Sequence, residues 1–270
     1  MLLPKLLLLS LVALLLPSQT ATNPKQELND QLFEAVRKGD VAAVTAALDH
    51  GADVNAKFRY GTTALFKAAE RGYAEVAKVL LDRGADVKVK DTFYGATAMS
   101  WALDNKHVDV VKLILQKDKT EVDDVLMNGV RETNAELVQV ALDNGGVSAQ
   151  TLTAALAMSL SQENAAAISE MLKKAGAQPP LEVDAATLQS YAGNYTSDGP
   201  QITVNVKDGK LFAVFGRDSY QLMAIDKTTF RPIAFDGITV TFKGEPGKIT
   251  GATFKQGPNS IELKRAEPKP

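Results

Sequence analysis

Hydrophobic and small residues recur along the first half of the chain at a spacing of 33 and then 34 positions. One column of the repeat holds large apolar residues, a second holds alanine and a third holds leucine. The three columns are Leu32, Leu65 and Met99; Ala35, Ala68 and Ala102; and Leu48, Leu81 and Leu115. A period of this length is typical of a solenoid, in which each unit packs only on its neighbours.

The columns continue beyond this region at shorter spacings of 27 and 30 positions. They then hold Leu126 and Leu156; Gly129 and Ser159; and Leu142 and Leu172. The second column stays small throughout, as expected where neighbouring helices approach closely, and the large apolar columns supply the stripe that each helix buries. The pattern therefore predicts five units, of which the last two are shorter and degenerate.

Each unit is predicted to contain two helices and a connector. In the second unit, TALFKAAERG (63–72) is typical of a short helix that ends at a glycine. The stretch AEVAKVLLDRGADV (74–87) predicts a second helix that ends at Gly84. The middle of the chain is therefore expected to be a series of helix pairs.

These residues resemble the ankyrin repeat family. The stretch GTTALFKAAERGY (61–73) stands where the family has Gly-x-Thr-Pro-Leu-His-x-Ala-Ala-x-x-Gly-His, and VLLDRGADV (79–87) matches its second-helix ending. The match is specific over residues 28–118. From 119 to 178 the two remaining units keep only the glycine that ends a helix.

The sequence departs from the family pattern at four positions. Alanine stands in place of the usual proline, and phenylalanine or serine in place of the usual histidine. These positions are Ala64, Ala98, Phe66 and Ser100.

The hydrophobic period changes to two beyond Pro179-Pro180, a pair that removes backbone donors and favours an extended path. The alternating apolar positions are Ile202, Val204 and Val206; Ile238, Val240 and Phe242; and Ile261 and Leu263. Turn signals separate them at Asp208-Gly209, at Asp236-Gly237 and at 244–247. The pattern predicts seven or eight short antiparallel strands between Tyr191 and Arg265, closed into a small barrel.

This second half resembles the lipocalin-like accessory domain appended to penicillin-binding-protein-related serine hydrolases. The residues that carry the resemblance are Tyr191, Gly193 and Tyr195, the Asp-Gly-Lys-Leu run at 208–211, and Phe230. The hydrolase itself is not implied, because the sequence contains no Ser-x-x-Lys. The predicted fold is thus an ankyrin-repeat α-solenoid followed by a small antiparallel β-barrel. Its predicted parts are a signal peptide (1–21), a repeat domain (25–178), a linker (179–184) and a β-domain (185–266).

The first residues have the layout of a secretory signal, with one cation at Lys5, an apolar run from Leu6 to Leu16 and small residues through Ala21. The alternative is a membrane anchor, but these eleven residues would cover only roughly half of a ~30 Å hydrocarbon core. We therefore expect export to the periplasm or outside the cell, with no stable membrane span after cleavage.

Composition narrows the possible chemistry. The formal charge of −2 lacks the basic excess that nucleic-acid binding requires. The chain has no cysteine, which excludes disulfides, thiolate metal sites and thiol nucleophiles. Its two histidines, His50 and His107, fall at the expected ends of helices. No catalytic residue, metal or cofactor is predicted.

Two other stretches carry a weak chemical signal. GEPGKIT (244–250) has two residues between its glycines where a phosphate loop has four, and it joins two strands, so a β-turn is preferred. Glu121, Asp123 and Asp124 could suggest a calcium site, but the loop lacks the bending glycine, so a solvated helix start is preferred.

The remaining candidate site is a surface for a protein partner. In the ankyrin family the hairpin tips and the first helices form the concave recognition face, and FRYG and TFYG occupy two successive tips. The candidate residues are Phe58, Arg59, Tyr60, Phe93 and Tyr94 at the tips, and Lys67, Glu70, Arg71, Trp101, Asp104 and Asn105 on the first helices. The alternatives are that the tip aromatics pack only on each other and that Trp101 is core. The column of Trp101 holds Glu34, Lys67, Asn128 and Met158 in the other units, and a position that accepts Glu, Lys and Asn favours exposure.

The sequence thus favours an exported, non-catalytic protein-interaction module. Two alternatives stay open, namely binding of a small molecule or cell-wall fragment by the barrel, and accessory control of an exported hydrolase. Against the first, small barrels are filled by their own side chains.

We expect the mature chain to begin near residue 22, because the apolar run and the small residues after it match a signal-peptidase substrate. Amino-terminal sequencing of the exported protein measures the cleavage point. Recovery of the chain from the cytoplasm with Met1 intact would contradict this expectation.

Overall fold

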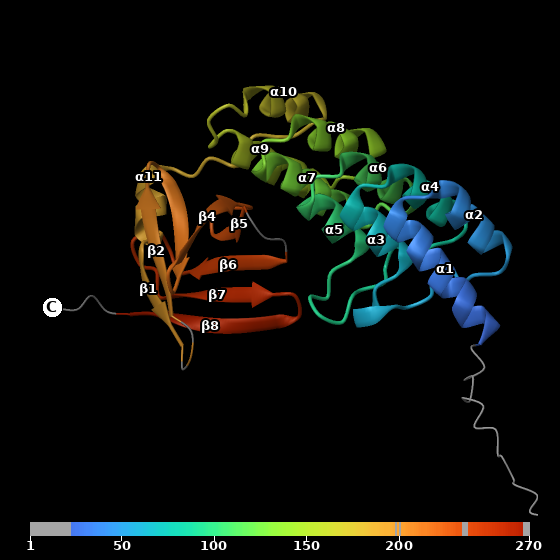
Figure 1. Cartoon of the computed structure of the whole chain (residues 1–270). Coiled ribbons are helices and arrows are strands. Elements are labelled where there is room, and N and C mark those ends of the chain that lie inside the picture. The colour runs from blue at the N-terminus through green and yellow to red at the C-terminus, as the bar shows by residue number, and fades with distance from the viewer. Residues whose placement is uncertain (1–22, 198, 200, 234–236, 267–270) are drawn as a thin grey trace, which may run out of the picture. The chain divides into compact units, whose positions relative to one another are not determined.

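The structure is a computed structural model that describes residues 23–197, 199, 201–233 and 237–266 (Figure 1). The expected signal peptide and the expected turn residue Asp236 lie outside these residues. By their contacts the residues form two compact units, the first ending at Trp101 and the second beginning at Ala102. The first unit is helical, and the second contains further helices and a β-barrel.

The first unit contains two complete helix pairs and the start of a third. Its elements are α1 (Pro24–Lys38), α2 (Val41–Asp49), the 3₁₀ turn η1 (Arg59–Gly61), α3 (Ala64–Arg71), α4 (Ala74–Asp82) and the first residues of α5 (Ala98–Asp104). Asp40 caps α2 by accepting a hydrogen bond from the Ala43 N–H at 3.0 Å. Gly39 and Gly72 end α1 and α3 with φ of 71° and 70°, a conformation that glycine adopts without steric cost.

The repeat columns form the core of this unit. Leu32, Leu65 and Met99 are 0%, 0% and 1% exposed, and the small residue Ala68 is 0% exposed. Helix α1 packs on α2 and α3, and α2 packs on α4. The periodicity of the sequence therefore identified residues that are buried between the helices of this unit.

The second unit continues the helix pairs. Its helices after α5 are α6 (Val108–Lys117), α7 (Val122–Arg131), α8 (Ala135–Asn144), α9 (Ala149–Ser159) and α10 (Ala166–Lys174). The two degenerate units retain their helices, and Leu126 and Leu156 are 0% and 2% exposed. In contrast, Leu48 and Leu142 of the third column are only partly buried.

The connectors between helix pairs differ in length. Residues 50–63 and 83–97 form long loops that precede α3 and α5, whereas residues 118–121 and 145–148 are short links before α7 and α9. Extended tips are therefore a feature of the loops before α3 and α5.

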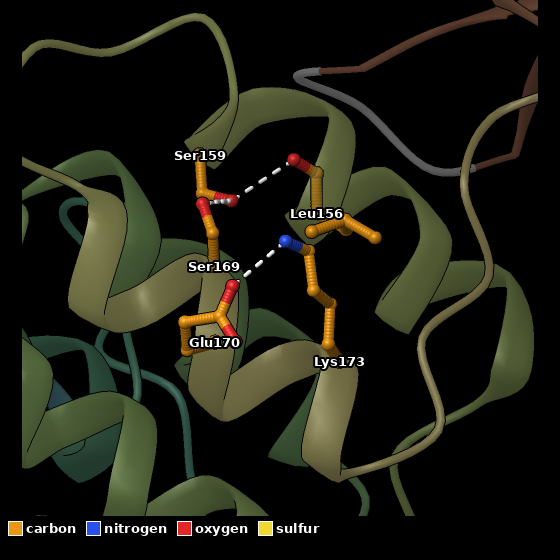
Figure 2. A network of polar contacts seen from close by, with 5 residues as sticks. All are labelled: Leu156, Ser159, Ser169, Glu170 and Lys173. Atoms are coloured by element: carbon orange, nitrogen blue, oxygen red, sulfur yellow. Dashed lines mark hydrogen bonds and ion pairs between the residues drawn. The ribbon is translucent and has the colours of Figure 1, made fainter.

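Ser159 replaces alanine in the small column of the fifth unit (Figure 2). Its hydroxyl donates to the Leu156 carbonyl at 2.9 Å and lies 2.8 Å from the Ser169 hydroxyl on α10. Both serines are buried, and the nearby Lys173 amine pairs with Glu170 at 2.7 Å. The buried hydroxyls are satisfied by each other, so this serine costs little at a helix contact.

The barrel follows a short helix, α11 (Ala185–Tyr191). Its strands are β1 (Gly193–Thr196), β2 (Gln201–Lys207), β3 (Lys210–Phe215), β4 (Asp218–Ala224), β5 (Thr229–Pro232), β6 (Ile238–Lys243), β7 (Gly251–Gln256) and β8 (Asn259–Arg265). Each strand pairs antiparallel with the next, and β1 pairs with β8 through Tyr195 opposite Arg265. Closure removes the exposed edges that an open sheet would present.

Aromatic side chains fill the barrel interior. Tyr191 stacks on Phe242 with ring centroids 4.3 Å apart, and Phe230 packs edge-on against Tyr191 at 5.5 Å. The Tyr195 hydroxyl donates to the Tyr191 carbonyl at 2.7 Å. The two tyrosines that carried the lipocalin-like resemblance are thus core residues.

Two details of the β-domain differ from the sequence expectation. Helix α11 was not predicted, although Asp184 caps it by accepting from the Thr187 N–H at 2.9 Å. Ile261 was expected on the inner face but is 37% exposed, and only Leu263 of that strand's apolar pair is buried. The loop at 244–247 joins β6 to β7, as expected of a turn.

Gly129→Ala should destabilise the protein. A methyl group at this position would lie 3.0 Å from both the Val138 backbone nitrogen and its Cγ2 on α8. Alanine gains about 1 kcal/mol in helix propensity, but overpacking costs about 1–3 kcal/mol and the backbone side of the contact cannot rotate away. We expect a net loss of about 1 kcal/mol in denaturant unfolding of the full chain, with a larger loss for Gly129→Ser. A more stable Gly129→Ala variant would show that helix propensity outweighs the contact.

Alkaline pH should weaken the barrel through Tyr195. Burial is the main cause that raises the pKa of Tyr195 to about 12, because it disfavours the phenolate. The unfolded chain loses this proton at its ordinary pKa of about 10. The stabilisation is therefore full below about pH 10 and is lost as the pH rises towards 12. In unfolding measurements across this window, Tyr195→Phe should show a shallower decline in stability than the wild type. Equal slopes would contradict the assignment.

Candidate functional site

The two long loops of the first unit carry an exposed aromatic surface. We call this surface, made by Arg59, Tyr60, Phe93 and Tyr94, the tip surface. Tyr60, Phe93 and Tyr94 are 49%, 66% and 72% exposed, and the last two are the most exposed large hydrophobic side chains among the described residues. Scattered exposed apolar residues are normal, but a contiguous group of rings is typical of an interaction surface.

A tight turn positions the first tip. Tyr60 has φ 61° and Gly61 has φ 70°, both in the left-handed region that glycine tolerates and tyrosine rarely adopts. The Phe58 N–H donates to the Thr62 carbonyl at 2.8 Å and so closes the turn. The Arg59 guanidinium lies 4.6 Å from the centroid of the Tyr60 ring, within the range of a cation–π contact.

The two tips are joined through their backbones. The Thr92 N–H donates to the Tyr60 carbonyl at 2.8 Å. A Cβ at Gly61 would lie 3.2 Å from Thr92 Cγ2, so the close approach favours glycine there. The Tyr60 and Phe93 rings are in contact, with centroids 5.7 Å apart. Packing between tips and exposure to solvent therefore occur together.

Asp91 anchors the second tip. Its side chain is buried, and one carboxylate oxygen accepts from the N–H groups of Phe93 at 2.9 Å and Tyr94 at 2.6 Å. The other oxygen accepts from the Trp101 indole N–H at 3.4 Å. The hydrogen bond from the Tyr94 N–H is the main cause that lowers the pKa of Asp91 below its ordinary value. The sequence reasoning missed this residue, although an aspartate two positions before a tip aromatic is a turn signal.

Trp101 completes a row of rings along the tip surface. Its ring centroid lies 6.1 Å from that of Tyr94, which in turn lies 4.6 Å from Phe93 in an edge-on arrangement. Trp101 itself is partly exposed. The geometry suits aromatic packing and leaves one side of the row open to solvent.

A pocket of about 150 Å³ lies beside this row. It is lined by Phe33, Arg59, Tyr60, Thr62, Phe66, Lys67, Glu70 and Trp101. The Lys67 amine pairs with the Glu70 carboxylate at 2.5 Å, so these two charges offset each other in the pocket wall. The pocket therefore combines four aromatic side chains with polar and charged groups.

The remaining candidate residues are less closely associated with the tips. Phe58 is partly buried because its ring stacks on Phe33 at 4.1 Å. Arg71 is exposed at the end of α3. Asp104 and Asn105 are also exposed, but they belong to the second compact unit. The structure thus brings together the tip residues with Lys67, Glu70 and Trp101.

The two histidines and the aspartates that were considered for a calcium site lie at helix ends. His50 is the C-cap residue of α2, and His107 precedes α6 at its N-cap. Asp123 and Asp124 lie in the first turn of α7, as expected of a solvated helix start. Within residues 23–197, 199, 201–233 and 237–266, no group of three or more metal-ligating side chains occurs. In the same residues no helix is both long and apolar enough to cross a membrane.

Comparison with known proteins gives one family match. A family model described as ankyrin repeats in three copies matches residues 8–91 and 32–125. A search of curated proteins found no significant match.

Replacing Asp91 by alanine should loosen the second tip while leaving the fold intact. The Phe93 and Tyr94 N–H groups and the Trp101 indole would each lose an acceptor. We expect amide exchange at Phe93 and Tyr94 to accelerate roughly five- to tenfold, as for the loss of one hydrogen bond. Because the pKa of Asp91 is lowered, the wild-type tip should keep its order above the ordinary aspartate pKa of about 4 and lose it in stronger acid.

Asp86 provides the matched control in the same loop. Its carboxylate accepts from the Lys88 N–H at 2.8 Å, and not from the Phe93 or Tyr94 N–H groups, which Asp91 holds. Asp86→Ala should leave exchange at Phe93 and Tyr94 unchanged. Equal acceleration by both substitutions would show that Asp91 has no special role.

Proposed function

On the premise that the helical region contains ankyrin repeats, we propose that this chain is an exported protein-interaction module whose tip surface contacts a protein partner. Ankyrin repeats are protein-interaction modules, and they are typically non-catalytic. Repeat solenoids present an extended surface because each unit contacts only its neighbours.

The proposal rests on the tip aromatics, whose rings are exposed to solvent while their backbone is held by hydrogen bonds. Phe93 and Tyr94 are 66% and 72% exposed, yet their backbone N–H groups are both held by the Asp91 carboxylate. Leaving a large apolar ring in water forfeits about 1.5–3 kcal/mol of burial. A partner that covers these rings would recover that free energy.

The rigidity of the tips supports the same proposal. Binding costs free energy for each loop and side chain that must be ordered, so a surface that is already ordered binds more tightly. The turn at Tyr60, the tip-to-tip hydrogen bond from Thr92 and the Asp91 carboxylate provide that order. Tyrosine, tryptophan and arginine, which are all present here, are enriched among residues that dominate binding.

Export rests on the sequence alone. Lys5 and the apolar run that ends at Leu16 support a cleaved signal, and a periplasmic or secreted location follows from it.

We infer a lipocalin-like identity for the barrel from the tyrosines at 191 and 195 and from Gly193, whose added Cβ would lie 3.1 Å from Arg265 Nε. A barrel filled by Tyr191, Tyr195 and other core side chains favours a supporting role over ligand storage. Uptake of a small molecule by the barrel in the full chain would overturn the supporting role.

Affinity capture with the full chain from an envelope or secreted extract, followed by titration of the captured protein, tests the proposal. Tyr94→Ala and Phe93→Ala should each weaken binding by about 2 kcal/mol, or roughly thirtyfold, with little change in the melting temperature. Leu160→Ala is the matched control, because Leu160 is 57% exposed but lies on the fifth helix pair. Unchanged affinity in both tip variants would refute the proposal, and a large loss of stability would show that the rings serve packing.

A further inference from the structure

The charges around the tip surface are unevenly paired. In the first unit, Arg37 pairs with Glu34 at 3.0 Å and Arg83 pairs with Asp49 at 2.8 Å. In the tip loops (50–63 and 83–97), three exposed cations make no ion pair with any other described residue. These cations are Lys57, Arg59 and Lys90.

Asp91, the carboxylate inside the second tip, does not offset these cations at the surface. Asp91 is buried, and its carboxylate is occupied by the Phe93, Tyr94 and Trp101 N–H groups. Glu70 is occupied by Lys67. Asp53 and Asp86 are the exposed carboxylates of these loops, so the exposed side chains combine aromatic rings with an excess of positive charge.

The pocket beside the rings has the size of one side chain. Its volume of about 150 Å³ is close to that of an apolar protein cavity known to hold a benzene ring. Phe33, Phe66 and Trp101 supply aromatic walls that would contact an apolar guest. Because Lys67 and Glu70 pair with each other in the wall, a guest of this size needs no charge of its own.

We propose that the tip surface binds an acidic peptide segment of its partner, and that one aromatic or large aliphatic side chain of that segment enters the pocket. The inference rests on the proposed function and names the partner's chemistry. A basic segment would meet Arg59 and Lys90 as like charges, whereas an acidic one would pair with them. The aromatic pocket selects a segment with an apolar anchor over a uniformly charged polymer.

The two parts of the site contribute differently to binding. Exposed ion pairs contribute little individually and are screened by salt, so these cations mainly set specificity and association rate. The anchor removes apolar area from water and supplies most of the affinity. Binding should therefore weaken with added salt but persist, and it should fall sharply when the anchor is removed.

Selection of random peptides displayed on phage against the full chain tests this inference. Enriched peptides should carry two or more acidic residues within a few positions of one aromatic or large aliphatic residue. Synthetic versions should bind at least tenfold more weakly when that residue is changed to alanine. The double substitution Arg59→Glu with Lys90→Glu in the protein should reduce affinity severalfold, mainly through slower association, while Lys255→Glu, at an exposed lysine on β7, should not.

The outcomes separate the two levels of the proposal. Enriched peptides that are neutral or basic but still depend on Tyr94 would overturn the acidic segment and keep the proposed function. Absence of any tip-dependent peptide would count against both. Binding of dextran sulfate that equals the best peptide and is insensitive to Phe93→Ala would show a general polyanion surface and overturn the anchored segment.

Discussion

The burial of one helix pair against its neighbour within each compact unit is the constraint on which the helical region depends. A single pair of short helices cannot cover its own apolar stripe, so the stripe is buried only where the neighbouring pair approaches closely. Contacts such as α1 with α3 and α7 with α9 provide this burial. The small column makes the approach possible, and at Gly129 even one added methyl group would meet the α8 backbone at 3.0 Å. Ser159 keeps the column small and satisfies its hydroxyl within the same contact.

That regular stacking leaves the connectors free to differ. The links before α7 and α9 are short, whereas the loops at 50–63 and 83–97 extend into tips. The tips are nevertheless ordered, because backbone hydrogen bonds and the Asp91 carboxylate replace the packing that a loop lacks. Solvent-facing rings on an ordered support are a surface prepared for binding, since less order must be gained when a partner arrives.

The barrel meets the same need for burial in a different way. Its strands close on themselves, so that β1 pairs with β8 and no neighbouring unit is required. Tyr191 and Tyr195 fill the interior, and each hydroxyl has a carbonyl acceptor. Arg265 lies against Gly193 and donates to the Ala192 and Ile249 carbonyls near the closing strands. The Tyr-x-Gly-x-Tyr motif is thus explained by closure and core packing.

The sequence by itself determined the spacing of hydrophobic positions, and therefore that the chain forms a helical repeat region followed by a region of β-strands. A spacing of 33 or 34 residues places apolar side chains on one face of successive helices, and alternation places them on one face of strands. Both effects are local, which is why the helix pairs and most strands could be predicted, whereas the exposure of the tip aromatics was expected from the ankyrin resemblance. The tertiary structure alone decided that Thr92 bonds to Tyr60 and that Asp91 turns inward to hold Trp101. It also decided that Ile261 lies outside the barrel core and that Phe58 stacks on Phe33. These contacts join residues on different loops, helices and strands, so they depend on how whole elements pack and leave no periodic trace in the sequence.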